Sequence, residues 1–299
     1  MRDLLEFIPV WATVKFLGIL PRAWSRALGI GLGRLVFRFH RRLQAVGLRN
    51  LEIAFPETLP AERKRWLRAE FDNLGRLLAE AARFPRYRRD NVEAVAIYDG
   101  LEHYRAARAR GQGVLLLTAH LGGWEIGSFV HSLCGYPMRV VIRELDNPYL
   151  HRLTQRYRTL HGNSTFGKQE FARGLLSAMR AGETVGLLMD TNMTPPQGIF
   201  VPFFGVPACT ASGLARVALR TGAAVVPAFT IWDSEISKYR IHFDPTLELH
   251  CTGDDEADAV ANTARFTQVI ESFVRRYPEQ WLWVHRRWKT RPPGEAPLY

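Results

Sequence analysis

The feature that most constrains the fold is an alternation of short apolar runs with helical segments, which begins at residue 114 and continues toward the C-terminus. Short apolar runs bounded by turn residues are typical of buried strands, whereas apolar residues at spacings of three and four indicate helices. This alternation predicts an α/β fold with a central, largely parallel twisted sheet flanked by helices. The predicted strands are 114–119, 139–143, 184–189 and 223–232, with 239–249 as an edge strand. The predicted helices are 62–83, 100–110, 147–160, 170–179, 210–220 and 256–277.

Three polar residues fall where predicted strands end. His120 and Asp190 each follow a strand, and Arg143 is the last residue of another. Because ligands of open α/β sheets bind beyond the carboxyl ends of the strands, we expect these side chains to contribute to one site. The forked guanidinium of Arg143 suits a phosphate, or else a salt bridge to a neighbouring carboxylate. Asp190 suits a binding role, or else the role of a turn or N-cap residue.

The segment 120–125 (His-Leu-Gly-Gly-Trp-Glu) carries the strongest chemical signal. A histidine of near-neutral pKa can accept a proton from an alcohol, and we expect Glu125, one turn into the next helix, to orient His120 for this task. The backbone N–H groups of Gly122 and Gly123 are candidates to bind an oxyanion. The alternatives are a structural histidine and a carboxylate that only favours the start of a helix. The combination favours acyl transfer onto a hydroxyl.

Other chemistries lack their sequence signals. The chain has no Gly-x-Ser-x-Gly nucleophile elbow and no Walker A loop, and the spacing around His120 fits no zinc site. Its three cysteines are far apart, form no metal pattern and fit a reducing compartment. We therefore expect the acceptor hydroxyl to attack a thioester directly, with no covalent enzyme intermediate, cofactor or metal.

The basic charge of the chain is concentrated near its N-terminus. The net charge is +11, and residues 1–110 hold 21 Lys and Arg against 12 Asp and Glu. The same region contains two apolar runs, 7–20 and 28–39, which are shorter than the roughly 20 residues that a spanning helix needs. They predict one or two helices lying on a membrane surface, or else two soluble helices packed on the core. We see no nucleic-acid motif and no cleaved signal peptide.

This pattern divides the chain into a membrane-associated helical segment, 1–45, and an α/β domain, 46–299. Within the domain, the aromatic segment 198–205 could form the wall of an acyl-chain pocket or belong to the core. The tryptophans and cations of 281–291 suit a membrane interface or an anionic headgroup, or else a packed chain end. Asn192 and Lys168 are weaker candidates for polar contacts with a substrate.

The sequence resembles a known family, the late acyltransferases of lipid A biosynthesis (lauroyl and myristoyl transferases) within the lysophospholipid acyltransferase superfamily. His-Leu-Gly-Gly-Trp-Glu is similar to the His-x4-Glu motif of that family. The resemblance continues in order along the chain and covers most of residues 114–291. Its further parts are Arg143 with Asp146-Asn147-Pro148, Asp190, 201–205, 208–210, 221–223, 278–283 and 285–289.

The resemblance implies an enzyme on the cytoplasmic face of the bacterial inner membrane. The donor would be an acyl thioester of acyl carrier protein or coenzyme A, and the acceptor a hydroxyl of a hydroxyacyl chain on a Kdo-bearing lipid A precursor. His120 and Glu125 would be the catalytic pair, and Arg143 and Asp190 would bind or support. Gly123 and Thr191 depart from residues common in the family, which leaves the reaction class standing but leaves open the acceptor, such as another membrane lipid of phosphatidylinositol mannoside or lysophospholipid type. A separate alternative is a non-catalytic lipid-binding homologue.

Overall fold

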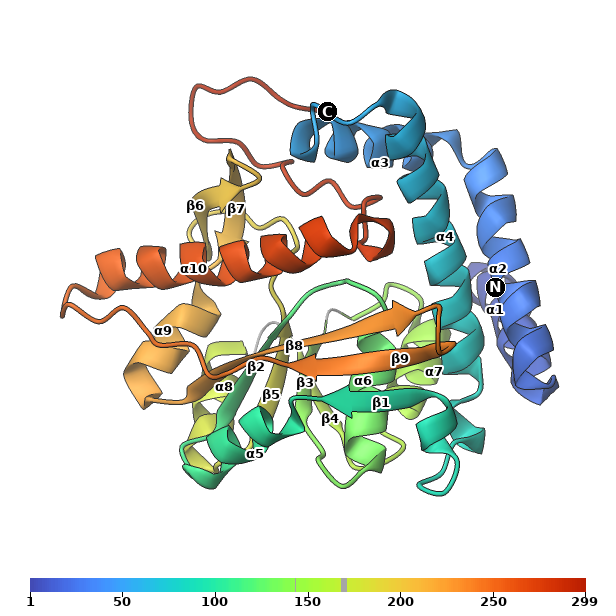
Figure 1. Cartoon of the computed structure of the whole chain (residues 1–299), viewed down its shortest axis with the longest axis horizontal. Helices are drawn as coiled ribbons and strands as arrows, with labels where there is room; N and C mark the ends of the chain where they lie inside the picture. The colour runs from blue at the N-terminus through green and yellow to red at the C-terminus, as the bar shows by residue number, and fades with distance from the viewer. Residues whose placement is uncertain (143, 168–170) are drawn as a thin grey trace.

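The computed structural model describes residues 1–142, 144–167 and 171–299, and its centre is a seven-stranded sheet (Figure 1). The strands are β1 (Ala96–Asp99), β2 (Val114–Thr118), β3 (Arg139–Ile142), β4 (Ser164–Gly167), β5 (Thr184–Leu188), β8 (Ala224–Asp233) and β9 (Lys238–Phe243). Their order is β1-β9-β8-β2-β5-β3-β4, and all neighbouring pairs are parallel except β8 and β9. The prediction of an α/β fold with a largely parallel sheet is confirmed.

Helices cover both faces of this sheet, which explains why β2 is apolar at consecutive positions. Leu115 and Leu117 pack in the same cluster as buried residues of α8, α9 and α10. Val114 and Leu116 face the opposite cluster, which includes buried residues of α5, α6 and α7. The bounds are α5 (Leu101–Ala109), α6 (Trp124–Leu133), α7 (Pro148–Arg158), α8 (Phe171–Arg180), α9 (Gly213–Thr221) and α10 (Asp255–Arg276).

Two predictions about the second half of the chain are wrong in detail. β9 is not an edge strand, because β1, which we did not predict, pairs with its outer side from Ala96 opposite Tyr239 onward. The helix predicted from residue 210 begins at Gly213, because the residues before it form a strand of a separate antiparallel hairpin. The hairpin consists of β6 (Gly198–Phe203) and β7 (Val206–Ala211).

The aromatic segment of this hairpin belongs to the core. Val201, Phe203 and Phe204 are all buried and pack in the cluster that contains α10. The ring of Phe203 lies against those of Trp281 and Trp288. Of the two roles expected for this segment, the structural one is observed.

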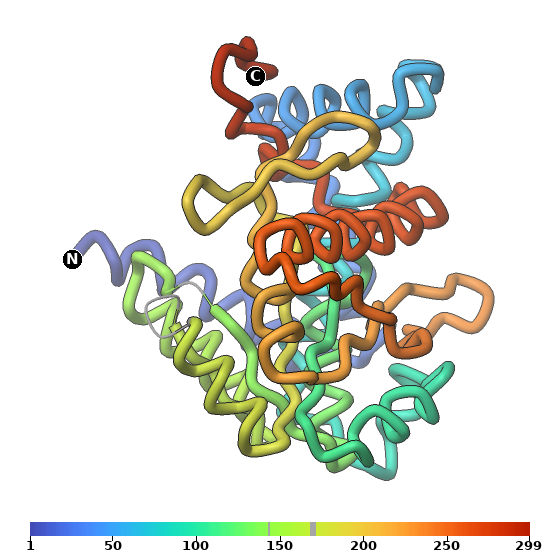
Figure 2. The backbone as a smooth tube through the Cα atoms, turned by 90° about the vertical axis from the view of Figure 1, so that its left-hand side faces the viewer, coloured from blue at the N-terminus to red at the C-terminus, as the bar shows by residue number. Residues whose placement is uncertain are grey.

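Four helices precede the sheet: α1 (Arg2–Ile19), α2 (Arg22–Phe39), α3 (Arg41–Ala54) and α4 (Pro60–Ala82). The α2 and α4 backbones approach closely, since a Cβ atom on Gly33 would lie 2.1 Å from the carbonyl oxygen of Phe71. In Figure 2, α1 lies beside α7, and Asn147 donates a hydrogen bond to the carbonyl of Asp3 at 2.8 Å. These helices are therefore packed on the α/β domain, and the division at residue 45, which falls within α3, remains a prediction.

The outer surfaces of α1 and α2 carry many exposed apolar side chains. They include Leu5, Ile8, Phe16, Ile19, Trp24, Leu28, Leu35 and Phe39. Within the described part of the chain, no helix combines the length and the hydropathy needed to cross a bilayer.

Candidate active site

The loop after β2 places His120 at the carboxyl edge of the sheet. The following residues are tied to other elements, with Leu121 paired to Trp281 and Gly122 to Thr230 of β8. Gly122 has a φ of 61°, and a Cβ atom there would lie 2.1 Å from the Thr230 carbonyl oxygen. Only glycine allows this approach. The loop is thus fixed, while 20% of the His120 side chain remains exposed.

Asp190, which follows β5, holds the imidazole of His120. Its Oδ1 accepts a hydrogen bond from Nδ1 of His120 at 2.8 Å. Its Oδ2 accepts two more, from the backbone N–H of His120 and from the indole N–H of Trp281, each at 2.8 Å. This geometry places the ring proton on Nδ1 and leaves a lone pair on Nε2, the nitrogen able to accept a proton. No residue in the described ranges hydrogen-bonds Nε2.

The two groups stabilise each other's charged forms. Burial alone would raise the pKa of Asp190, but the charge of His120 and the hydrogen bonds from His120 and Trp281 hold that pKa at about 2. Burial alone would lower the pKa of His120, but the charge and hydrogen bond of Asp190, with the charge of Glu125, raise it above its ordinary value. Asp190 is therefore ionised at neutral pH and stabilises the imidazolium that forms when Nε2 takes a proton.

The structure corrects the predicted role of Glu125. Its carboxylate forms a bidentate ion pair with Arg158 of α7, in which Nε lies 3.0 Å from Oε2. The prediction that Glu125 orients His120 is wrong, because the first turn of α6 directs its side chain to Arg158, and Asp190 occupies Nδ1. Glu125 remains close enough for its charge to raise the pKa of His120.

The structure also contradicts the oxyanion-binding role predicted for the two glycines. The N–H of Gly122 donates to the Gln280 carbonyl at 2.9 Å, and the N–H of Gly123 donates to a β8 carbonyl at 2.7 Å. Neither N–H is free to bind an oxyanion, because both already donate hydrogen bonds that pair the loop with β8 and with Gln280. The next two amides, of Trp124 and Glu125, begin α6 and have no acceptor within the described residues. They are the available donors at the positive end of this helix.

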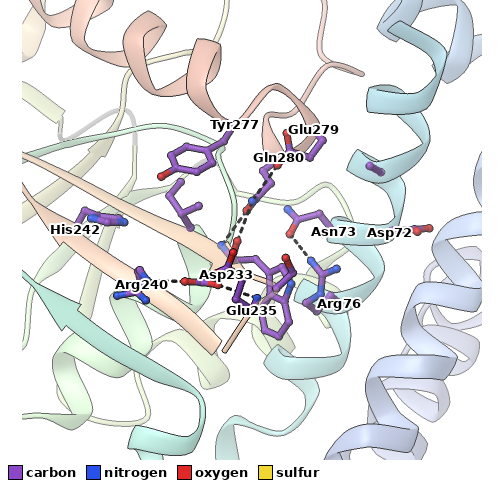
Figure 3. Close-up of a pocket in the computed structure, with 14 residues that line it drawn as sticks. Asp72, Asn73, Arg76, Asp233, Glu235, Arg240, His242, Tyr277, Glu279 and Gln280 are labelled. Atoms are coloured by element: carbon purple, nitrogen blue, oxygen red, sulfur yellow. Dashed lines mark hydrogen bonds and ion pairs between the residues drawn. The ribbon is translucent and has the colours of Figure 1, made fainter. Parts of the chain in front are cut away.

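A polar cavity of about 510 Å³ lies behind the loop, between α4 and the β8–β9 hairpin (Figure 3). In its wall, Asn73 donates to the Gly122 carbonyl at 3.0 Å. The Gln280 side chain bonds both backbone groups of Trp232, at 2.9 and 3.0 Å. Together with the bond from Gly122 to the Gln280 carbonyl, these bonds connect α4, β8 and the segment around Gln280 to the loop after β2. The cavity wall therefore fixes the backbone that carries His120.

Three further residues were predicted to contact a substrate: Asn192, Arg143 and Lys168. Asn192 uses both side-chain groups on Thr290, at 3.0 and 2.9 Å, and its backbone N–H donates to Nε2 of His285. The amide of Asn192 thus anchors the segment around Thr290, and its predicted contact with a substrate stays a prediction. Arg143 and Lys168, two further candidates, lie outside the described residues.

The tryptophans of the segment near the C-terminus are packed in the core, as one of the two alternatives expected, while Lys289 is exposed. Trp281, Trp283, Arg287 and Trp288 are each at most 1% exposed. Arg287 donates to the Cys209 carbonyl at 3.0 Å, and Trp281 donates to Asp190 as described above. Through Trp281 the segment supports the Asp190 carboxylate that holds His120.

Two residues near the imidazole were not predicted. Arg158 is one of several arginines on α7, and no local spacing marks it as the partner of Glu125. Trp281 lies in the segment 278–283 that resembles the family, but nothing in the sequence indicates that its N–H bonds Asp190. Both contacts join segments far apart in the chain.

Comparison with known proteins shows the family. Residues 4–290 match the family described as bacterial lipid A biosynthesis acyltransferase. The chain belongs to this family. It is 30% identical to the lipid A biosynthesis palmitoleoyltransferase of Escherichia coli (strain K12), over 97% of this chain and 94% of the relative. It is also 30% identical to the lauroyltransferase of that organism, over 97% and 92%, and 26% identical to the myristoyltransferase, over 93% and 91%.

Membership of the lipid A acyltransferase family confirms two predictions from the sequence. The resemblance to the late acyltransferases of lipid A biosynthesis is correct, and the protein is an acyltransferase. The three relatives are named for different acyl groups, although their identities to this chain are similar. Membership of the family therefore does not determine which acyl group this chain transfers.

Proposed function

We propose that this protein transfers a fatty acyl chain from an acyl thioester, carried by acyl carrier protein or coenzyme A, to a hydroxyl of a lipid A precursor. The observation that carries the proposal is the hydrogen bond between Nδ1 of His120 and a buried, ionised Asp190, which leaves Nε2 free. In this proposal His120 is the general base, and Asp190 is the positioning residue in place of Glu125.

The reaction then follows from proton transfer at one atom. Nε2 of His120 takes the proton of the acceptor hydroxyl as the oxygen attacks the thioester carbonyl carbon. Asp190 stabilises the imidazolium. When the tetrahedral intermediate collapses, the carbon–sulfur bond breaks and Nε2 returns the proton to the leaving sulfur, which departs as a thiol. The product is an ester, and the enzyme is regenerated without a covalent intermediate.

The oxyanion of that intermediate needs donors close to the imidazole. We assign this role to the free amides of Trp124 and Glu125 at the start of α6, instead of the occupied amides of Gly122 and Gly123. Amide donors aimed at developing negative charge lower the barrier by a few kcal/mol each. The helix dipole of α6 adds to them in the same direction.

We also propose that the protein works at the cytoplasmic face of the inner membrane, held by α1 and α2. The support is the exposed apolar surface of these two helices together with the basic charge of the N-terminal third. Apolar burial and attraction to anionic lipid act together in surface-bound helices. This arrangement would bring the lipid acceptor to the enzyme.

The test of the reaction uses purified full-length protein, acyl carrier protein and coenzyme A loaded with labelled acyl chains, and a panel of lipid acceptors. The wild type should acylate a lipid A precursor, and His120→Ala should transfer about 10²- to 10⁴-fold more slowly. His250→Ala is the matched control, because that side chain is 59% exposed near the start of α10. Transfer only to other lipids would refute the acceptor, and lipid binding without any transfer would refute the proposed turnover.

The membrane role is tested by sedimentation with vesicles that contain anionic phospholipid. Leu28→Ser with Leu35→Ser removes two exposed side chains of α2. They are 43% and 55% exposed, so burial of the exposed half of each side chain in the membrane contributes about 1 kcal/mol, and vesicle affinity should fall about 30-fold. Leu59→Ser with Val260→Ser, which removes exposed side chains outside α1 and α2, should leave affinity unchanged. Equal binding by all three proteins would contradict the membrane proposal.

A further inference from the structure

A second cavity, of about 180 Å³, adjoins the active site at the start of α6. Its walls come from α1, the end of α4, the 3₁₀ turn η1 (Phe84–Arg86) and α7, which gather beside α4 at one end of the sheet (Figure 1). Most of the lining is apolar. The apolar lining residues are Val14, Ala81, Ala82, Phe84, Leu153 and Tyr157.

The cavity has one charged end, and that end is near the imidazole. Glu125 and Arg158, which form the ion pair described above, both line it. Glu125 and Arg158 also act on the pKa of His120 through their charges, in opposite directions. The ring of Trp124, adjacent to Glu125, lies edge-on to His120 with 5.3 Å between ring centroids. The cavity therefore ends at the Glu125–Arg158 pair, whose charges reach His120, and its apolar walls extend from that pair between helices.

We propose that this cavity holds the hydrocarbon chain of the acyl donor and that Val14 and Ala81 limit its length, an inference that rests on the proposed acyl transfer. The thioester carbonyl must lie beside His120, so the donor chain must leave that point through neighbouring space. A donor chain arrives on a water-soluble carrier and needs protein to cover it, whereas the chains of a lipid acceptor stay in the membrane. An apolar cavity that ends at Glu125, whose charge acts on the imidazole, meets the donor's requirement.

A cavity of fixed size gives a measurable dependence on chain length. Each methylene group buried in an apolar site strengthens binding about fourfold, and the gain ends when the cavity is full. The values of kcat/KM should therefore rise with donor length and then level off or fall. A larger residue in the wall should move this break to shorter chains, and a smaller residue should move it to longer ones.

The experiment compares acyl carrier protein donors from octanoyl to palmitoyl with one lipid acceptor. Ala81→Phe fills the half-buried side of the cavity and should shorten the preferred chain while octanoyl transfer is kept. Val14→Ala enlarges the cavity and should lengthen the preferred chain. Ala106→Phe, on an exposed position of α5, is the matched control and should keep the wild-type profile. Circular dichroism of each variant checks folding, and Val14→Ala tests the idea even if Ala81→Phe does not fold.

The outcomes separate this inference from the proposed function. If the wild type transfers no chain from any donor, the proposed function fails. If the wild type is active but Val14→Ala and every folded cavity-filling variant keep its donor profile, the cavity assignment fails alone. A second series varies the chain length of the acceptor with one donor. If the cavity variants change that dependence and leave the donor profile unchanged, the donor assignment is overturned.

Discussion

Replacement of Asp190 by Asn tests the role of the buried carboxylate with almost no change in volume. Oδ2 of Asp190 accepts two hydrogen bonds, from the His120 backbone and from Trp281, so the amide oxygen of Asn should occupy that position. The amide nitrogen then faces Nδ1 of His120 and can only donate. Nδ1 must become the acceptor, and the ring proton moves to Nε2. In that tautomer Nε2 cannot take the proton of a hydroxyl.

The expected loss is large because the wrong tautomer is inactive. We expect kcat to fall about 10³- to 10⁴-fold, which corresponds to about 4 to 5.5 kcal/mol of activation free energy. Because Asp190 raises the pKa of His120, wild-type activity should decline as the pH falls through that raised value. If Asp190→Asn keeps some activity, that activity should decline at a lower pH than the wild-type activity does, because the pKa of His120 is no longer raised by Asp190.

Two measurements decide the outcome. Steady-state transfer gives kcat, and nitrogen-15 NMR of the His120 ring gives the tautomer. Asp258→Asn is the matched control, because Asp258 is a buried aspartate that accepts hydrogen bonds from Thr252 and Gly253, in the loop that precedes α10. It should leave both readings unchanged. If Asp190→Asn retains near-native kcat, or keeps the proton on Nδ1, the reasoning is refuted.

Three further predictions follow from buried groups. Trp281→Phe removes a donor from the ionised Asp190 carboxylate and should lower the free energy of unfolding in urea by about 1.5–3 kcal/mol; an unchanged value would contradict the bond's importance. Burial raises the pKa of Glu70 well above its ordinary value, so ionisation opposes folding as pH rises from the unfolded pKa toward the folded one. Glu70→Gln should therefore raise the melting temperature more at about pH 8 than at about pH 5. An equal rise at both pH values would contradict the raised pKa of Glu70. Gly122→Ala should destabilise by more than about 1–2 kcal/mol in thermal unfolding, because its Cβ would meet the Thr230 carbonyl.

Much of the fold could be predicted because its signals are local. The run 114–119 is apolar at consecutive positions, and β2 is indeed buried on both faces. The order of the strands is not a local property, so the sequence predicts β9 as an edge strand although β1 pairs with its outer side. The short β6–β7 hairpin was missed for a related reason, since its strands are defined by pairing with each other.

The candidate site shows the same division between local and distant information. The spacing of His120 and Glu125 suggested a partnership, but a helix begins between them and turns Glu125 toward α7. The proposed partner, Asp190, is 70 residues away and reaches the imidazole because β2 and β5 are adjacent. The glycine amides looked free in the sequence, but pairing with β8 and the C-terminal segment uses them.

The sequence by itself determined the class of fold, the family and the residue that we propose as the base, because burial patterns and a short motif are written in neighbouring positions. Only the tertiary structure decided which carboxylate holds His120, which amides remain free and where an apolar cavity meets the site. These features depend on the order of the strands and on side chains that come together from distant segments. Hydrogen bonds and burial depend on which groups are close in space, whatever their separation along the chain.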